Sequence, residues 1–261
     1  MKDLSILTKE VCNIARKAGA YLINERKNFS EDKIEQKHAH DYVSYVDKSS
    51  EAIIVSALKE ILPESGFLTE EGSATHDGEP CWWVIDPLDG TTNYVHGFNP
   101  FAVSIALRNA DEILLGVVYE ATLNECFHAY KGGGAYLNDK PIHVNERHGI
   151  DQALIGIELP YDSNRYKTTA IKLISHFFGY CGGIRMNGSA AVAICNVAAG
   201  RWDGWMEKYI GQWDFMAAAI ILQEAGGKVT DFEGNGFFLN DNHIVASNST
   251  IHVELLKALK L

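Results

Sequence analysis

The spacing of apolar residues predicts two helices in the first quarter of the chain. Between Ile6 and Leu22 the apolar residues recur at helical intervals, with lysine and glutamate residues between them. A second segment with one apolar face runs from about Val46 to Leu62. Pro63 follows directly and cannot continue a helix, so the second helix is predicted to end there.

The middle of the chain is predicted to be rich in strands. Short apolar runs separated by polar turns are interpreted as strands at 66–68, 82–85, 101–107, 113–119, 125–130 and 135–137. Three glycines, Gly132 to Gly134, lie between the last two runs. Because no Lys-Ser or Lys-Thr pair follows them, we interpret these glycines as a hairpin turn and not as a phosphate-binding loop.

The last third of the chain alternates between the two kinds of pattern. It is predicted to contain strands at 154–159, 228–231 and 243–246, and helices at 170–178, 188–199, 212–225 and from about 249 onward. No internal repeat, low-complexity tract or clear linker interrupts the chain. The mixture of strands and helices predicts one α/β unit with two lobes.

Composition and charge narrow the classes of function. The chain has 261 residues and a formal net charge of -11. A chain this acidic is poorly suited to binding nucleic acid or an anionic membrane through bulk electrostatics, so neither is expected as a partner. If the substrate is a phosphate ester, local cations or backbone dipoles must reverse the sign of the field at the site.

The cysteines and the N-terminal segment bear on location. The five cysteines are widely spaced without a Cys-x-x-Cys pair, so neither a disulfide framework nor a thiolate zinc site is expected. Charged residues interrupt the apolar runs of the N-terminal segment, and no run elsewhere reaches the roughly 20 residues of a membrane span. We therefore expect a cytoplasmic protein.

The most informative segment is Asp86-Pro87-Leu88-Asp89-Gly90-Thr91-Thr92, directly after the predicted strand 82–85. A carboxylate at the end of a buried strand is costly unless it is paired or binds a metal. Pro87 takes the chain out of the sheet, so a turn can bring Asp86 and Asp89 to one side with the Leu88 carbonyl between them. Such a cluster of oxygen donors suits Mg²⁺, whereas the competing interpretation is an ordinary turn capped by aspartate.

The residues that follow extend this pattern toward an anion. Gly90 allows the backbone to approach a ligand closely. If a helical turn begins at Gly90, the free N–H groups at its start point toward an anion. Metal ligands and a phosphate cradle would then lie within one short segment.

Further acids are candidates for the same site, and each has a simpler interpretation. Glu70, beside Glu71, follows the predicted strand 66–68, where an acid pair also suits a solvated surface. Asp214 and Asp47 lie at helix starts, where aspartate commonly caps the helix and complements its dipole. Glu207 lies among aromatic residues, where it either binds hydroxyl groups or belongs to the surface rim.

Together these segments resemble the inositol monophosphatase family. The segment from Trp83 to His96 is similar to the first signature of that family almost residue for residue. The segment from Trp213 to Ala218, with Glu224 to Gly227, resembles the second signature. Gly188-Ser189-Ala190-Ala191 and Glu70-Glu71 match further family segments. The matches occur in the order and spacing of the family over most of the chain.

The resemblance implies a set of metal ligands. Glu70, Asp86 and the Leu88 carbonyl would bind one Mg²⁺ ion. A second ion would be bound by Asp86, Asp89 and Asp214, and Glu70 would share a third, weaker ion. The cofactor implied is therefore Mg²⁺, with two or three ions at each active site.

The resemblance also implies catalytic and substrate-binding residues. Thr91, paired with Asp47, would help to deprotonate the water held by the first metal, and Glu70 belongs to the same catalytic set. Gly90 and Thr91 would bind the phosphate through their N–H groups, and substrate hydroxyls would contact Glu207 and the segment starting at Gly188. The full set of substrate-binding residues implied is Asp89, Gly90, Thr91, Gly188, Ser189, Ala190, Glu207 and Asp214.

The fold implied by the resemblance is of the α+β class. It is the layered αβαβα sandwich of the inositol monophosphatase and fructose-1,6-bisphosphatase type, usually a homodimer. The chain would form a single domain over 1–261, with an N-terminal α+β lobe at about 1–145 and a C-terminal α/β lobe at about 146–261.

The expected activity is Mg²⁺-dependent hydrolysis of a small polyol phosphate monoester by metal-activated water, with inositol 1-phosphate as the leading substrate. Histidinol phosphate and sister sugar or nucleotide phosphates are the alternatives. A bisphosphate would need basic residues for its second phosphate, and Arg185 and Lys208 are the nearest candidates. Because some bacterial members of the family are thought to bind the transcription machinery, a regulatory protein-binding role is the alternative without catalysis.

Overall fold

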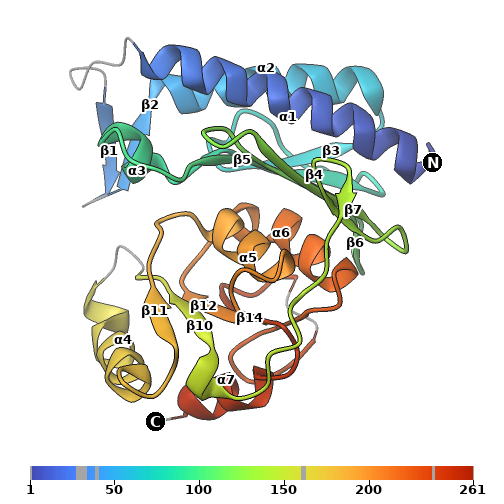
Figure 1. The fold of residues 1–261 in the computed structure, drawn as a ribbon. Helices are drawn as coiled ribbons and strands as arrows, with labels where there is room; N and C mark the ends of the chain where they lie inside the picture. Colours follow the sequence, from blue (N-terminus) through green and yellow to red (C-terminus); the bar gives the residue numbers. More distant parts are fainter. Residues whose placement is uncertain (1, 28–33, 39–40, 160–162, 237–238, 261) are drawn as a thin grey trace.

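The computed structural model describes residues 2–27, 34–38, 41–159, 163–236 and 239–260. Figure 1 shows five layers, in which helices and sheets alternate from the N-terminal helices to the C-terminal helix. This layered αβαβα arrangement confirms the predicted fold class. The two sheets lie on either side of a central helix layer, which is where the two halves of the chain meet.

The first two layers come from the first half of the chain. Helices α1 (Leu4–Arg26) and α2 (Tyr45–Ile61) cover the outer face of a seven-stranded sheet (Figure 1). Its strand order is β3-β4-β5-β6-β7-β8-β9, and all neighbouring strands are antiparallel except β3 and β4. The strands are β3 (Gly66–Thr69), β4 (Trp82–Asp89), β5 (Ala102–Arg108), β6 (Ile113–Glu120), β7 (Glu125–Tyr130), β8 (Ala135–Leu137) and β9 (Lys140–Pro141).

The central layer consists of α5 (Ala190–Ala198) and α6 (Gln212–Glu224), whose side chains are buried on nearly every side. A helix that is apolar all round is typical of a layer between two sheets. Gly116 in β6 lets α6 approach the sheet closely, because a Cβ atom at Gly116 would lie 2.3 Å from the Ala217 carbonyl oxygen. This close packing fixes α6, and with it Asp214, against the seven-stranded sheet.

The second sheet has five strands in the order β11-β10-β12-β14-β13. Strand β10 is parallel to both β11 and β12, whereas β14 is antiparallel to β12 and β13. Helices α4 (Ser163–Phe177) and α7 (His252–Ala258) form the last layer (Figure 1). The strands are β10 (Leu154–Ile157), β11 (Gly183–Arg185), β12 (Gly204–Lys208), β13 (Lys228–Thr230) and β14 (His243–Ser247).

The remaining elements are short. Strands β1 (Ile34–His38) and β2 (Asp41–Ser44) form a two-stranded antiparallel sheet beside α3 (Thr91–Val95), and a 3₁₀ turn covers Ile150–Gln152. Within the described ranges, no helix combines the length and the apolar character that crossing a membrane requires.

Most predicted elements are confirmed, with three differences that matter for the site. The strand predicted to stop at Ile85 continues to Asp89, but its pairing with β5 is irregular between Asp86 and Asp89. The helix predicted at 170–178 begins at Ser163. Strand β12 was not predicted, because a glycine and two charged residues weaken its apolar pattern. The glycines 132–134 do connect two antiparallel strands, β7 and β8, as predicted.

Candidate active site

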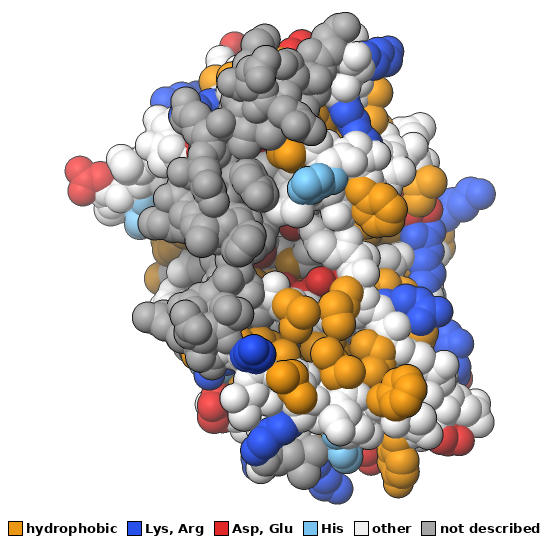
Figure 2. All heavy atoms as spheres, turned by 90° about the vertical axis from the view of Figure 1, so that its left-hand side faces the viewer, with side chains coloured by type: hydrophobic (Ala, Val, Ile, Leu, Met, Phe, Trp, Pro, Cys, Tyr) orange, Lys and Arg blue, Asp and Glu red, His pale blue; other side chains and the backbone are white. Residues whose placement is uncertain are grey.

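A pocket of about 340 Å³ lies where the two halves of the chain meet. Figure 2 shows this side of the molecule, with a hollow in the middle, acidic side chains visible inside it, and hydrophobic side chains gathered below it. The predicted site residues that line the pocket are Glu70, Asp86, Leu88, Asp89, Gly90, Thr91, Gly188, Ser189, Ala190, Glu207 and Asp214. Asp47 does not line the pocket but contacts it through Thr91.

The end of β4 forms one wall of the pocket. Oδ1 of the buried Asp86 accepts a hydrogen bond of 2.8 Å from the Leu88 amide, which leaves Oδ2 for another ligand. The Pro87 carbonyl accepts the Ser50 hydroxyl at 3.0 Å, so α2 supports this turn from behind. The local geometry therefore brings Asp86 and Asp89 to one pocket, as predicted, although the chain is still part of the sheet.

Gly90 is required by its conformation and its surroundings. Its φ of 90° lies in the left-handed region, and α3 begins at the next residue. A Cβ atom at Gly90 would lie 2.9 Å from the Pro100 carbonyl oxygen and 3.2 Å from that of Gly188. Any larger residue would therefore separate the start of α3 from the loop that precedes α5.

Asp89 connects the seven-stranded sheet to the central helix layer. Its Oδ2 atom accepts hydrogen bonds from the Ser189 hydroxyl and, at 3.0 Å, from the Ala191 amide. Ser189 is also the N-cap residue of α5, and its Oγ accepts the Val192 amide at 3.3 Å. A carboxylate from one half of the chain thus accepts a hydrogen bond from a free amide at the start of a helix from the other half.

Glu70 follows β3 and is held in position by backbone contacts. Its amide donates to the Ile85 carbonyl at 3.1 Å, which ties it to the neighbouring strand β4. Glu51 of α2 is fully buried and accepts the amides of Glu71 at 2.8 Å and Ser73 at 2.9 Å. Nothing in the local sequence pattern distinguishes Glu51, because an acid in the middle of a helix is ordinarily solvated.

Thr91 contacts Asp47, its predicted catalytic partner, and the carbonyl of Leu88, a predicted metal ligand. Its hydroxyl lies 3.3 Å from Asp47 Oδ1 and 3.0 Å from the Leu88 carbonyl oxygen, so it can donate to either. Asp47 is 1% exposed, which separates it from bulk water. The structure therefore brings together Thr91 and Asp47, two residues that are 44 positions apart in the chain.

Asp214 has the capping role that the sequence allowed, and it also lines the pocket. Its Oδ2 atom accepts the Gly211 amide at 2.6 Å, which closes the first turn of α6. The Trp213 carbonyl accepts the Ser104 hydroxyl at 3.0 Å, so β5 fixes the start of this helix. The two interpretations of Asp214 are therefore compatible, because the same residue caps α6 and lines the pocket.

The electrostatics of the pocket favour a cation. Burial raises the pKa of Asp86 well above its ordinary value, and the charges of Glu70, Asp89 and Asp214 raise it further. Burial also raises the pKa of Asp89 to about 6, although the hydrogen bonds from Ser189 and Ala191 act in the opposite direction. Among the described residues that line the pocket, none is lysine, arginine or histidine.

These donors fit Mg²⁺. They are carboxylate and carbonyl oxygens, which are the ligands that hard divalent cations prefer, and neutralising their charge would relieve the mutual repulsion that raises their pKa values. The residues present therefore suit the metal implied by the sequence.

One acid in the pocket, Glu158, was not predicted. It follows β10, and its Oε1 atom accepts the Asn187 amide at 2.7 Å. Its own amide donates to the Met206 carbonyl, so Glu158 lies beside Glu207 of the parallel strand β12. Neighbouring parallel strands end at the same edge of a sheet. A prediction of β12 would therefore have placed Glu158 beside Glu207.

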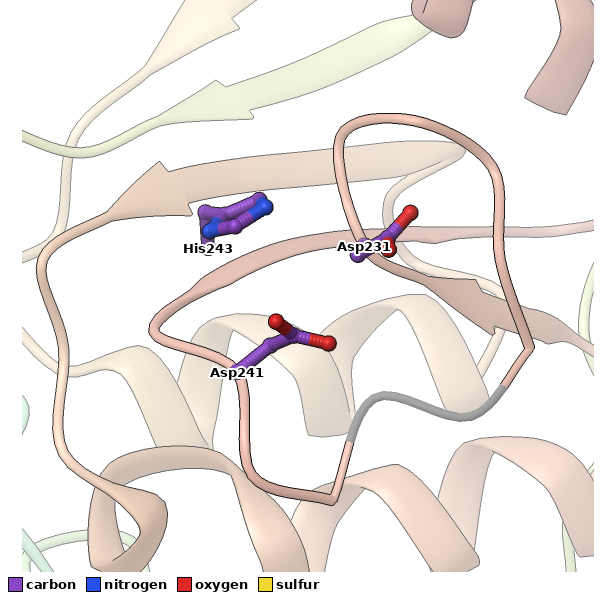
Figure 3. Close-up of side chains that lie close together, drawn as sticks. All are labelled: Asp231, Asp241 and His243. Atoms are coloured by element: carbon purple, nitrogen blue, oxygen red, sulfur yellow. The ribbon is translucent and has the colours of Figure 1, made fainter.

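A second group of metal-ligating side chains lies outside the pocket. Figure 3 shows Asp231, Asp241 and His243, whose ligand atoms lie within 4.8 Å of one another. Both oxygens of Asp231 accept hydrogen bonds from Asn235, and His243 Nε2 lies 2.9 Å from Glu233. Because Asp231 and His243 already have protein partners, we interpret these two residues as supports of the loop between β13 and β14.

The fold and the pocket define a layered αβαβα protein with a carboxylate-rich pocket suited to divalent cations. The model of the inositol monophosphatase family matches residues 3–260. The Nus factor SuhB of Vibrio cholerae is 39% identical over 235 residues, which cover 90% of this chain and 88% of that protein. The inositol-1-monophosphatase of Mesorhizobium japonicum is 36% identical over 258 residues, which cover 98% of this chain and 97% of that protein.

A solved structure agrees with these matches. The extragenic suppressor protein suhB from Bartonella henselae superimposes with a TM-score of 0.91 at 35% identity, and the match covers 98% of both chains. This chain belongs to the inositol monophosphatase family.

Proposed function

We propose that this protein is a Mg²⁺-dependent phosphatase that hydrolyses the phosphate monoester of a small polyol, with inositol 1-phosphate as the leading substrate. The observation that carries the proposal is the pocket in which Glu70, Asp86, Asp89 and Asp214 meet the start of α3. The inositol-1-monophosphatase that is 36% identical over nearly the whole chain supports the same substrate.

The proposed metal ligands divide into two sets. Glu70, Asp86 and the Leu88 carbonyl would hold one ion, and Asp86, Asp89 and Asp214 would hold a second. When bound, the ions would supply hydroxide at neutral pH and neutralise charge on the phosphate and the leaving oxygen. Glu70 would also share the third, weaker ion.

The protein's own groups would handle the phosphate and the proton. The N–H groups of Gly90 and Thr91 would bind phosphate oxygens at the start of α3. The Thr91 hydroxyl would accept a proton from the attacking water while it donates its own proton to Asp47, which lies 3.3 Å away. Glu207 and the segment Gly188-Ser189-Ala190 would contact the hydroxyls of the substrate.

A substrate panel tests this proposal. Phosphate release would be measured with Mg²⁺ from inositol 1-phosphate, histidinol phosphate, fructose 1,6-bisphosphate, 3′-phosphoadenosine 5′-phosphate and NADP, with Asp89→Asn as the blank. We expect the highest kcat/KM for inositol 1-phosphate. A lead for another ester would retain the mechanism and change the substrate, whereas no release above the blank would refute the phosphatase.

A second candidate function is regulatory binding to another protein. A relative that is 39% identical is named a Nus factor, and the net charge of -11 suits a basic partner. A pull-down with Asp89→Asn distinguishes the two roles, because partner binding that survives the loss of activity would support the regulatory one. We also propose a homodimer in the cytoplasm, and light scattering would test the dimer.

A further inference from the structure

The wall of the pocket formed by the five-stranded sheet contains two neighbouring acids, Glu158 and Glu207. Strands β10 and β12 are parallel, with Ile157 paired to Met206, so the next residue of the chain is an acid in both cases: Glu158 directly after β10 and Glu207 within β12. Glu158 is 7% exposed and Glu207 is 9% exposed, and both line the pocket. Two carboxylates in register on adjacent parallel strands project to the same side of the sheet.

The Glu207 carboxylate has no hydrogen-bond partner among the described residues, although it is nine-tenths buried. Glu158 differs, because it accepts the amides of Asn187 at 2.7 Å and of Gly188 at 3.3 Å. The Glu207 carboxylate opens onto the pocket, so a ligand that displaces water from it must supply donors or positive charge in return.

Among the described residues that line the pocket, none carries a positive charge that could offset these two acids. Burial raises the pKa of Glu207 well above its ordinary value, and Glu158, Asp214 and Asp89 raise it further. Burial likewise raises the pKa of Glu158 to about 7. The Tyr166 hydroxyl of α4 is buried without a hydrogen-bond partner among the described residues, and burial together with the charge of Glu207 raises its pKa. A cationic ligand group would offset this repulsion and favour the ionised forms of both acids.

The two basic residues considered for a second phosphate lie elsewhere. The Lys208 ammonium lies over the rings of Tyr209 and Phe232 and lines a different pocket. The Arg185 guanidinium donates to the Ile184 carbonyl at the exposed end of β11. The prediction that these residues are the nearest to a second phosphate therefore gains no support from the structure.

We propose that Glu158 and Glu207 form an acidic subsite that selects substrates by the charge of their alcohol part. Among esters that share one carbon skeleton, those with an ammonium group opposite the phosphate bind best, those with neutral hydroxyls bind next, and those with a carboxylate or second phosphate are rejected. This proposal rests on the proposed phosphatase function and specifies the class of its substrate. Glu158 determines the specificity for the charge of the alcohol. A variant without the Glu158 charge would keep Glu207, which would still bind hydroxyl groups.

Three esters with the same three-carbon skeleton test the ranking. They are 3-amino-2-hydroxypropyl phosphate, glycerol 3-phosphate and 3-phosphoglycerate, which differ in charge at the far end. At pH 8.5 with Mg²⁺, we expect kcat/KM to fall in that order. In Glu158→Gln, which keeps an oxygen acceptor for the Asn187 amide, we expect the ratio between the first and last ester to fall about tenfold or more. Glu254→Gln on the exposed part of α7 is the matched control and should leave the ratio unchanged.

A binding measurement separates the subsite from the phosphatase. Calorimetry with Mg²⁺ and inorganic phosphate present would compare 3-amino-1,2-propanediol, glycerol and glycerate. We expect the amine to bind about tenfold more tightly than glycerol, and Glu158→Gln to remove that advantage. If the amine binds in this way but no ester is cleaved, the subsite stands and the phosphatase fails. If the esters are cleaved at equal rates, or Glu158→Gln slows all three equally, the subsite is refuted and Glu158 only supports the 187–188 loop.

Discussion

The carboxylate of Asp89, at the end of β4, accepts the hydroxyl of Ser189, the N-cap residue of α5. The first residue belongs to the seven-stranded sheet and the second to the central helix layer, so this contact joins the two halves of the chain at the pocket. Asp89 is also a proposed metal ligand. One side chain therefore combines a structural contact with the proposed chemistry, and its substitution must be designed to separate the two.

Asp89→Asn achieves that separation, because asparagine keeps an oxygen that can accept from Ser189 and loses the charge. We expect kcat/KM to fall at least about a hundredfold, since even residues that only support metal ligands have effects of that size. The folded-state pKa of about 6 lies above the ordinary value of 3.8, so at neutral pH the ionised group destabilises the metal-free protein.

The free energy of unfolding of metal-free Asp89→Asn should therefore equal or exceed that of the wild type at pH 7.5, as measured by urea denaturation. Asp241→Asn, outside the pocket, is the control for loss of an acid. Activity near the wild-type level with Mg²⁺ would contradict the assignment of Asp89 as a metal ligand.

Thr91→Ala should lower kcat more than it raises KM, because the proposed proton transfer to Asp47 is needed in the transition state. We expect a loss of about a hundredfold in kcat. Thr91→Ser keeps the hydroxyl and should retain most of the activity. A change confined to KM would mean that Thr91 only positions the phosphate. Asp47→Asn should show a similar loss, and the double variant should lose less than the sum of the two.

Glu51→Ala tests whether α2 positions Glu70. The substitution removes the acceptor of the Glu71 and Ser73 amides, so we expect the protein to lose about 1–3 kcal/mol in free energy of unfolding. We also expect Mg²⁺ affinity, measured by calorimetry, to fall about tenfold, because the turn that carries Glu70 loosens. Glu60→Ala on the exposed side of the same helix should change neither quantity. Unchanged Mg²⁺ affinity in a destabilised Glu51→Ala would limit Glu51 to a role in folding.

His252 predicts a pH dependence of stability. It is buried between Thr230 and Ser247, and burial lowers its pKa from 6.5 to about 4. Between these two values the unfolded chain binds more protons at this residue than the folded protein does, so its contribution to stability is lost as the pH falls from 6.5 to 4.

The measurement compares urea unfolding of the wild type and of His252→Gln at pH 7.5 and pH 4.5. Relative to the variant, the wild type should lose on the order of 2 kcal/mol over this interval. Other groups titrate in both proteins, and the difference between the two proteins removes their effect. Parallel pH profiles would show that His252 does not titrate differently in the folded and unfolded chains.

The sequence predicted the parts of the site that lie within one local segment. The run from Asp86 to Thr92 was identified because an acid, a proline and a glycine directly after an apolar strand have a specific geometric meaning. Glu51 and Glu158 could not be found in this way, because their roles depend on partners 20 or more residues away. The sequence pattern also does not predict the full extent of β4, because a proline within a strand predicts its end, whereas the structure accommodates Pro87 through irregular pairing.

The two sheets contribute different things to the pocket. The acids proposed for the metals at the ends of β3 and β4 come from the seven-stranded sheet, and the acids proposed to recognise the alcohol come from β10 and β12. Apart from Asp214, chemistry and recognition are therefore encoded in separate stretches of the chain. Substitutions in the later stretch can redirect such an enzyme to a new ester while its hydrolytic machinery is inherited unchanged.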